Sequence, residues 1–163
     1  MAKRAAFLGM FTALGLVFGW LETLVPIYPM VPGMKIGLAN LVTLLVLYRL
    51  GWKEAAGVSL LRIGLSSLLF GTVTMMLYSL AGAALSLLIM VILKRSDHVS
   101  ILGVSVAGGV LHNTGQIILA AFLMENHTIL YGFPLLMLSG VIAGALVGVA
   151  GAFLHKHLPK EIS

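Results

Sequence analysis

The chain has 163 residues, of which 60% are hydrophobic and only 9% are charged, and its mean hydropathy is +1.11. Since about 25% charge is typical of a soluble domain, this composition excludes a water-soluble fold and predicts an integral membrane protein. The absence of cysteine excludes disulfides and thiolate chemistry. In so apolar a chain, the net charge of +5 indicates the cytoplasmic edge of a bilayer rather than nucleic-acid binding.

Apolar segments follow one another along the chain, separated by short polar or proline-rich breaks. We predict six membrane helices that together form a single membrane domain over residues 1–163, an all-α bundle. Their approximate ranges are 5–25, 34–50, 55–70, 73–93, 99–124 and 130–153. We predict loops at the proline-rich stretch 26–33 and at 94–98, and a polar turn at 51–54. Gly71-Thr72 is the weakest break, and one kinked helix across it would give five spans.

The basic residues are distributed unevenly in the six-span arrangement. One side holds eight lysines and arginines, and the opposite side holds only Lys35. A five-span arrangement would move Lys94, Arg95, Lys156 and Lys160 to the other side and abolish this bias. Because cytoplasmic loops are enriched in lysine and arginine, the bias favours six spans with both termini in the cytoplasm.

Small residues recur every four positions on the first and last predicted helices. Such faces let two helix backbones approach closely in a membrane. For the last helix we predict packing within the chain, whereas the first helix is equally compatible with internal packing and with docking of a partner helix. The residues are Ala5, Gly9 and Ala13, then Gly15 and Gly19, on the first helix, and Gly140, Gly144 and Gly148 on the last.

Charged and amide side chains inside the apolar segments are the candidate functional residues, because a charge near the bilayer centre costs about 2.5–3.5 kcal/mol. Arg62 lies midway along the third segment. One interpretation is that it snorkels to the inner interface. The other is that it is buried, where its guanidinium binds an anion or pairs with Glu22.

His112, Asn113 and Gln116 project from the fifth segment over a narrow arc, since residues three and four apart share a helix face. Two interpretations are open: interhelical hydrogen bonds that hold the bundle together, or the lining of a cavity. A cluster of three favours the cavity. With one imidazole and no carboxylate beside it on this helix, we expect no metal ligation.

Glu22, Lys35 and Asn40 lie in the outer half of the first two segments. They are either ordinary interfacial residues or the lining of an outward-facing vestibule. Together with Arg62 and His112 they predict a cavity of net positive charge. Such a cavity favours a small anionic or zwitterionic molecule as the ligand.

Two stretches, Met34–Leu44 (MKIGLANLVTL) and Gly108–Gln116 (GGVLHNTGQ), resemble signature stretches of a small bacterial membrane family. That family is known as heptaprenyl diphosphate synthase component I, or the Gx transporter family. It is similar to the substrate-binding S components of energy-coupling factor (ECF) vitamin transporters. The resemblance implies a six-helix protein of the bacterial cytoplasmic membrane that captures a small molecule from outside.

The same resemblance implies roles for particular residues. It implies that Ala5, Gly9 and Ala13 form the face that docks onto a membrane coupling protein, which in turn carries two ATPases. It also implies that the cavity is lined by Lys35, Asn40, His112, Asn113 and Gln116.

The synthase name of the family implies an accessory rather than a catalytic role for this chain. Prenyl diphosphate condensation needs clustered aspartates that hold Mg²⁺ and diphosphate, and the only aspartate is Asp97. The sequence also lacks a P-loop and any nucleophile triad, so we expect no catalytic residues and no cofactor. Three functions compete: a solute-binding subunit for uptake, an accessory subunit working with a soluble prenyltransferase, and a structural scaffold.

Overall fold

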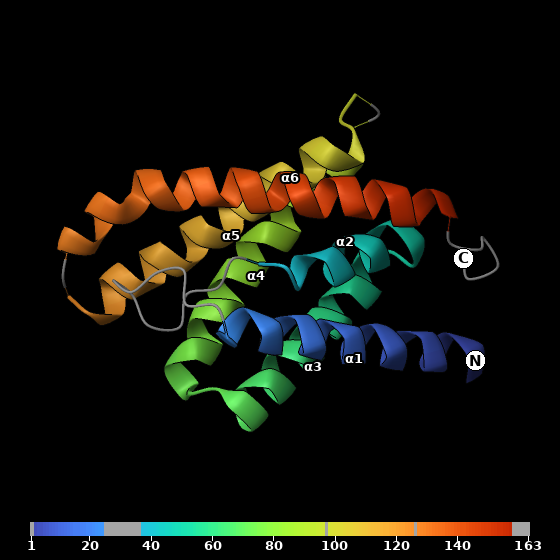
Figure 1. Ribbon diagram of the computed structural model, residues 1–163, viewed down its shortest axis with the longest axis horizontal. Coiled ribbons are helices and arrows are strands. Elements are labelled where there is room, and N and C mark those ends of the chain that lie inside the picture. The colour runs from blue at the N-terminus through green and yellow to red at the C-terminus, as the bar shows by residue number, and fades with distance from the viewer. Residues whose placement is uncertain (1, 25–36, 97, 126, 158–163) are drawn as a thin grey trace.

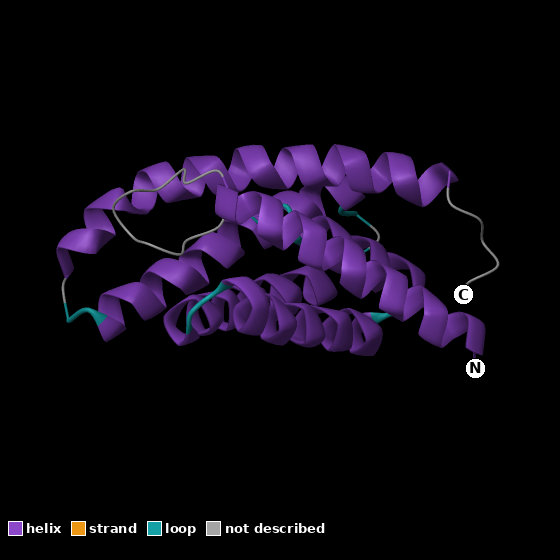
Figure 2. Ribbon diagram, turned by 60° about the horizontal axis from the view of Figure 1, so that its bottom comes forward, coloured by secondary structure: helices purple, strands orange, loops and turns teal. Residues whose placement is uncertain are grey.

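The computed structural model describes residues 2–24, 37–96, 98–125 and 127–157. Over these residues the protein is all-α, with six α-helices and one short 3-10 helix, and Figure 2 shows how little of the chain lies outside them. The elements are α1 (Ala2–Leu24), α2 (Asn40–Arg49), α3 (Trp52–Phe70), α4 (Val73–Lys94), α5 (Ile101–Leu123), η1 (His127–Gly132) and α6 (Phe133–His157).

Four of the described helical segments are long and apolar enough to cross a membrane: those of α1, α4, α5, and η1 with α6. The ten residues of α2 extend about 15 Å, about half of a bilayer's hydrocarbon core. Large apolar side chains face outward on the helices, and those of Leu68 and Phe122 are 84% and 78% exposed. An outer surface of this kind suits lipid rather than water. The chain is therefore a multi-pass membrane protein.

The starts of two helices differ from the sequence prediction. The second helix begins at Asn40 rather than at residue 34, because Gly37 has a φ of +96° that a helix cannot accommodate; residues 34–36 lie outside the described part. The third helix begins at Trp52, so residues 52–54 of the predicted polar turn 51–54 form its first turn. Gly51, with a φ of +112°, directly precedes this helix.

The weak break between the third and fourth segments is confirmed. Helix α3 ends at Phe70 and α4 begins at Val73. The hydroxyl of Thr72 accepts a hydrogen bond of 3.2 Å from the N–H of Met75, which caps the first turn of α4. Two helices therefore take the place of the single kinked helix.

The helices form two groups that meet along the middle of the molecule. In one group α1 packs against α2 and α3, and in the other α5 packs between α4 and α6. The groups are joined where α3 meets α4 and where α2 meets α4, α5 and α6. Across the described residues, no Cα of α1 lies within 8 Å of α4, α5 or α6.

The small-residue face of the last helix packs within the chain, as predicted. A Cβ placed on Gly109 of α5 would lie 2.4 Å from the carbonyl oxygen of Gly140 in α6. One placed on Gly144 would lie 2.7 Å from the Cα of Val106. Only glycine allows these two backbones to come so close, and we call this contact the glycine seam.

Helix α1 begins and α6 ends at the same end of the molecule, which we call the terminal end (Figures 1 and 2). Cationic side chains tie the helices together there. Arg4 forms a salt bridge with Glu54, and Nζ of Lys94 donates a hydrogen bond of 2.5 Å to the carbonyl oxygen of Leu47. The main apolar core also fills this end, with Phe11, Val46, Val58, Met90 and Val147 among its buried members.

Candidate functional site

Arg62 is buried between α3 and α1, with 4% of its surface exposed. A Cβ placed on Gly15 would lie 2.7 Å from its Cδ, and one on Gly19 would lie 3.8 Å from its Nη1. The side chain therefore runs along α1 away from the terminal end, toward Glu22, with which it interacts electrostatically. Arg62 is therefore buried and does not snorkel to the terminal end, while binding of an anion by its guanidinium stays a prediction.

Glu22 is buried near the end of α1 and binds the chain just before α2. Its Oε1 accepts hydrogen bonds from the backbone N–H groups of Gly37 and Leu38. A carboxylate beside the first N–H groups of a helix is stabilised by the helix dipole. Glu22 therefore balances the charge of Arg62 and also fixes the start of α2.

Asn40 and His112 meet at Gly37, where the two groups of helices come together. A Cβ on Gly37 would lie 3.0 Å from Nδ2 of Asn40 and 3.6 Å from Cδ2 of His112. A second glycine, Gly82 of α4, accommodates the imidazole from the other side, since a Cβ there would lie 2.9 Å from Nδ1 of His112. The sequence analysis did not single out Gly37 or Gly82; a glycine inside a predicted helix was the available signal.

Gln116 lies next to His112 on α5. Its Nε2 lies 3.0 Å from Nε2 of His112, so the amide N–H donates and the imidazole nitrogen accepts. Glu22, Asn40 and His112 thus contact Gly37, while Arg62 interacts electrostatically with Glu22 and Gln116 lies against His112. These five side chains come from four helices, and we call them the polar cluster: Glu22, Asn40, Arg62, His112 and Gln116.

The side chain of Asn113 points toward α6 rather than toward His112 and Gln116. Its Nδ2 donates hydrogen bonds to the carbonyl oxygen of Leu136 at 2.8 Å and to Oγ of Ser139 at 3.1 Å, both in α6. The three polar residues of α5 therefore diverge: His112 and Gln116 bond to each other, while Asn113 holds α5 to α6. Interhelical bonding, one of the two interpretations, describes Asn113.

Several buried polar atoms in and near the polar cluster have no hydrogen-bond partner among the described residues. They are Nδ2 of Asn40, Oγ1 of Thr43, Nε of Arg62, Oγ of Ser86, Oδ1 of Asn113 and Oε1 of Gln116. An unsatisfied buried donor or acceptor costs about 1–3 kcal/mol. Because the set contains both donors and acceptors, it suits a polar molecule that also offers both.

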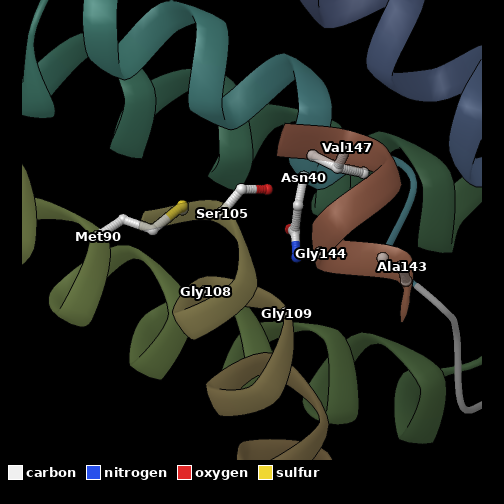
Figure 3. Close-up of a pocket in the computed structure, with 9 residues that line it drawn as sticks. Asn40, Met90, Ser105, Gly108, Gly109, Ala143, Gly144 and Val147 are labelled. Atoms are coloured by element: carbon white, nitrogen blue, oxygen red, sulfur yellow. The ribbon is translucent and has the colours of Figure 1, made fainter. Parts of the chain in front are cut away.

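The space beside the polar cluster is small. The cavity that Asn40 lines has about 10 Å³ of room for the centre of a water-sized sphere, which is about what one water needs (Figure 3). A hollow of about 620 Å³ lies on the outer face of α6, but its lining from Val141 to Phe153 is entirely apolar. The cavity beside Asn40 is therefore too small for a solute larger than water.

The net positive charge predicted for the site stays a prediction. Lys35 lies outside the described residues. Within the described part of the chain, Arg62 and Glu22 interact electrostatically, so the guanidinium has a carboxylate of opposite charge in its surroundings.

The two small-residue faces of α1 have different surroundings. Gly15 and Gly19 pack against Arg62 of α3. Ala5, Gly9 and Ala13 are exposed, and a Cβ on Gly9 would meet nothing within 4 Å. This second face is therefore available to lipid or to a partner.

The family model for heptaprenyl diphosphate synthase component I matches residues 11–154. The chain belongs to this family. Comparisons with curated proteins and with solved structures give no match.

The region matched by the component I family includes every residue of the polar cluster and both sides of the glycine seam. It also includes Gly15 and Gly19, which make room for Arg62. The first residues of α1, with Ala5 and Gly9, precede it.

Proposed function

We propose that this component I family member is a membrane-embedded solute-binding subunit of an uptake system. The observation that carries the proposal is the polar cluster. All five of its side chains are buried, and Asn40, Arg62 and Gln116 each have a donor or acceptor atom without a partner among the described residues. Burying such groups in a membrane is costly, and proteins retain them mainly where they bind something. A rigid scaffold would satisfy them internally.

The charges of the polar cluster support a zwitterionic solute over a highly anionic one. Arg62 interacts electrostatically with Glu22, so a ligand with one positive and one negative group is suited to both side chains. A diphosphate would bring several negative charges close to Glu22 with a single buried guanidinium to balance them. A small zwitterion is therefore the class of solute that we favour within the anionic-or-zwitterionic prediction.

The direction of access follows from the position of the apolar core. That core fills the terminal end, whereas Glu22 lies near the other end of α1 and His112 lies midway along α5. With the termini in the cytoplasm, as the distribution of basic residues favours, the cluster is reached from outside. This arrangement suits a subunit that captures an external solute.

The exposed face of Ala5, Gly9 and Ala13 supports docking of a partner. Small residues allow a second helix to approach closely and gain dispersion contacts. By its similarity to ECF S components, the expected partner is a membrane coupling protein that carries two ATPases.

The proposal is tested by identifying the small molecule that copurifies with the protein. Wild type, Arg62→Gln and His112→Ala are purified, denatured and extracted, and the released solutes are measured by mass spectrometry. Gly64→Ala on α3 is the matched control, because a Cβ there meets nothing within 4 Å. We expect one solute in wild type and in the control, reduced at least tenfold in the two site variants. Equal amounts in all four proteins would contradict the proposed site.

The family description favours a second candidate function, an accessory membrane subunit of a prenyl diphosphate synthase. Affinity purification from native membranes separates the two candidates. Copurified ATPases and a coupling protein support uptake, and a copurified soluble prenyltransferase supports the synthase role.

A further inference from the structure

The cavity beside Asn40 is lined by residues from both groups of helices. Figure 3 shows the side chains of Asn40 and Ser105 pointing toward the same space, with the sulfur of Met90 facing it. The glycines of α5 and α6 form the remaining wall, Gly108, Gly109 and Gly144 among them. Asn40 is 7% exposed, Ser105 3% and Met90 2%, so these three lining side chains are buried.

The chemistry of the lining restricts what can occupy this cavity. Nδ2 of Asn40 is a donor without a partner among the described residues, so the occupant must accept a hydrogen bond. A metal cation or an ammonium ion cannot do so. The volume of about 10 Å³ excludes an organic solute and suits one water molecule.

We propose that this cavity binds a single structural water that accepts a hydrogen bond from Nδ2 of Asn40 and donates one to Oγ of Ser105. The water bridges the start of α2 to α5 and so links the two groups of helices. Buried waters of this kind satisfy polar groups that no side chain reaches. The water satisfies Nδ2 of Asn40, which is one of the unpaired atoms of the polar cluster, and leaves those of Arg62 and Gln116 to a solute.

Radiolytic labelling tests the water directly. A short X-ray pulse splits a bound water into a hydroxyl radical, which oxidises the nearest susceptible side chain, and methionine sulfur is readily oxidised. Met90 is too buried to react with radicals from bulk solvent, whereas Met10 is 47% exposed and serves as the internal standard. We expect oxygen addition at Met90 in the wild-type protein.

Asn40→Leu replaces the donor with an apolar group of similar size. We expect it to lower Met90 labelling at least fivefold while Met10 labelling stays unchanged. Ser105→Ala, which removes the second hydrogen bond, is the alternative if the first variant does not fold, and we expect at least a twofold decrease. An unlabelled Met90 in wild type, or labelling that is equal in wild type and in the folded variant, would overturn the proposal.

Discussion

The glycine seam between α5 and α6 allows a quantitative prediction for Gly144→Ala. The new Cβ would lie 2.7 Å from the Cα of Val106 and 2.8 Å from the carbonyl oxygen of Ser105. Carbon atoms normally approach to about 3.5–4.0 Å, so the two backbones must separate by about 1 Å. Both colliding atoms belong to the main chain of a helix and cannot rotate away, as a side chain would.

Two effects of opposite sign determine how far Gly144→Ala changes the free energy of unfolding. Overpacking costs about 1–3 kcal/mol, whereas alanine gains about 1 kcal/mol over glycine in helix propensity. We therefore expect Gly144→Ala to lower the free energy of unfolding by up to about 2 kcal/mol, which corresponds to a fall in Tm of up to about 8 °C. The assay is thermal unfolding in detergent, followed by the fluorescence of Trp20 and Trp52.

Gly64→Ala is the control for this prediction. It also adds a methyl group inside a helix, but into open space, so only the propensity gain applies and Tm should stay constant or rise. If the two variants have the same Tm, the close backbone contact of the seam is refuted.

Three further predictions concern α1, α4 and the end of α5. Gly15→Ala pushes against the stem of Arg62, so it should lower Tm by a few degrees relative to Gly9→Ala, which meets open space; equal values would contradict the position of Arg62. Thr72→Ala removes the cap of α4 and should cost about 1 kcal/mol in unfolding free energy, with an unchanged value indicating that the cap is not formed. Glu125 has a φ of +47°, so Glu125→Gly should stabilise by about 1 kcal/mol, and a fall in Tm would argue against this backbone conformation.

Much of the fold could be predicted from the sequence, because its signals are local. The apolar run after Thr72 and the charged Lys94 define α4, and the glycines at steps of four on α6 predicted a close helix contact. The start of α2 could not be predicted in this way. Whether Gly37 lies inside a helix or at a positive φ depends on Glu22, which binds the preceding turn from a different helix.

The residue types of the candidate site could be predicted, but not the directions of their side chains. Helical spacing places Asn113 and Gln116 on nearly the same face, yet one bonds to α6 and the other to His112. Likewise, the side chain of Arg62 is long enough to point toward either end of the bundle. It points along α1 because Gly15 and Gly19 leave space for it there. Such choices depend on tertiary contacts that no local pattern contains.

The central claim is that the buried charges of the polar cluster bind a solute. The most direct measurement is the molar ratio of copurified solute to protein in the double variant Glu22→Gln/Arg62→Gln, compared with wild type. Glu22→Gln keeps the size of the side chain, and Arg62→Gln leaves a shorter polar one. The two charges are removed together, so no unpaired buried charge remains and the protein should still fold. We predict a folded protein whose solute content falls at least tenfold. A folded double variant that retains the wild-type content would contradict the account.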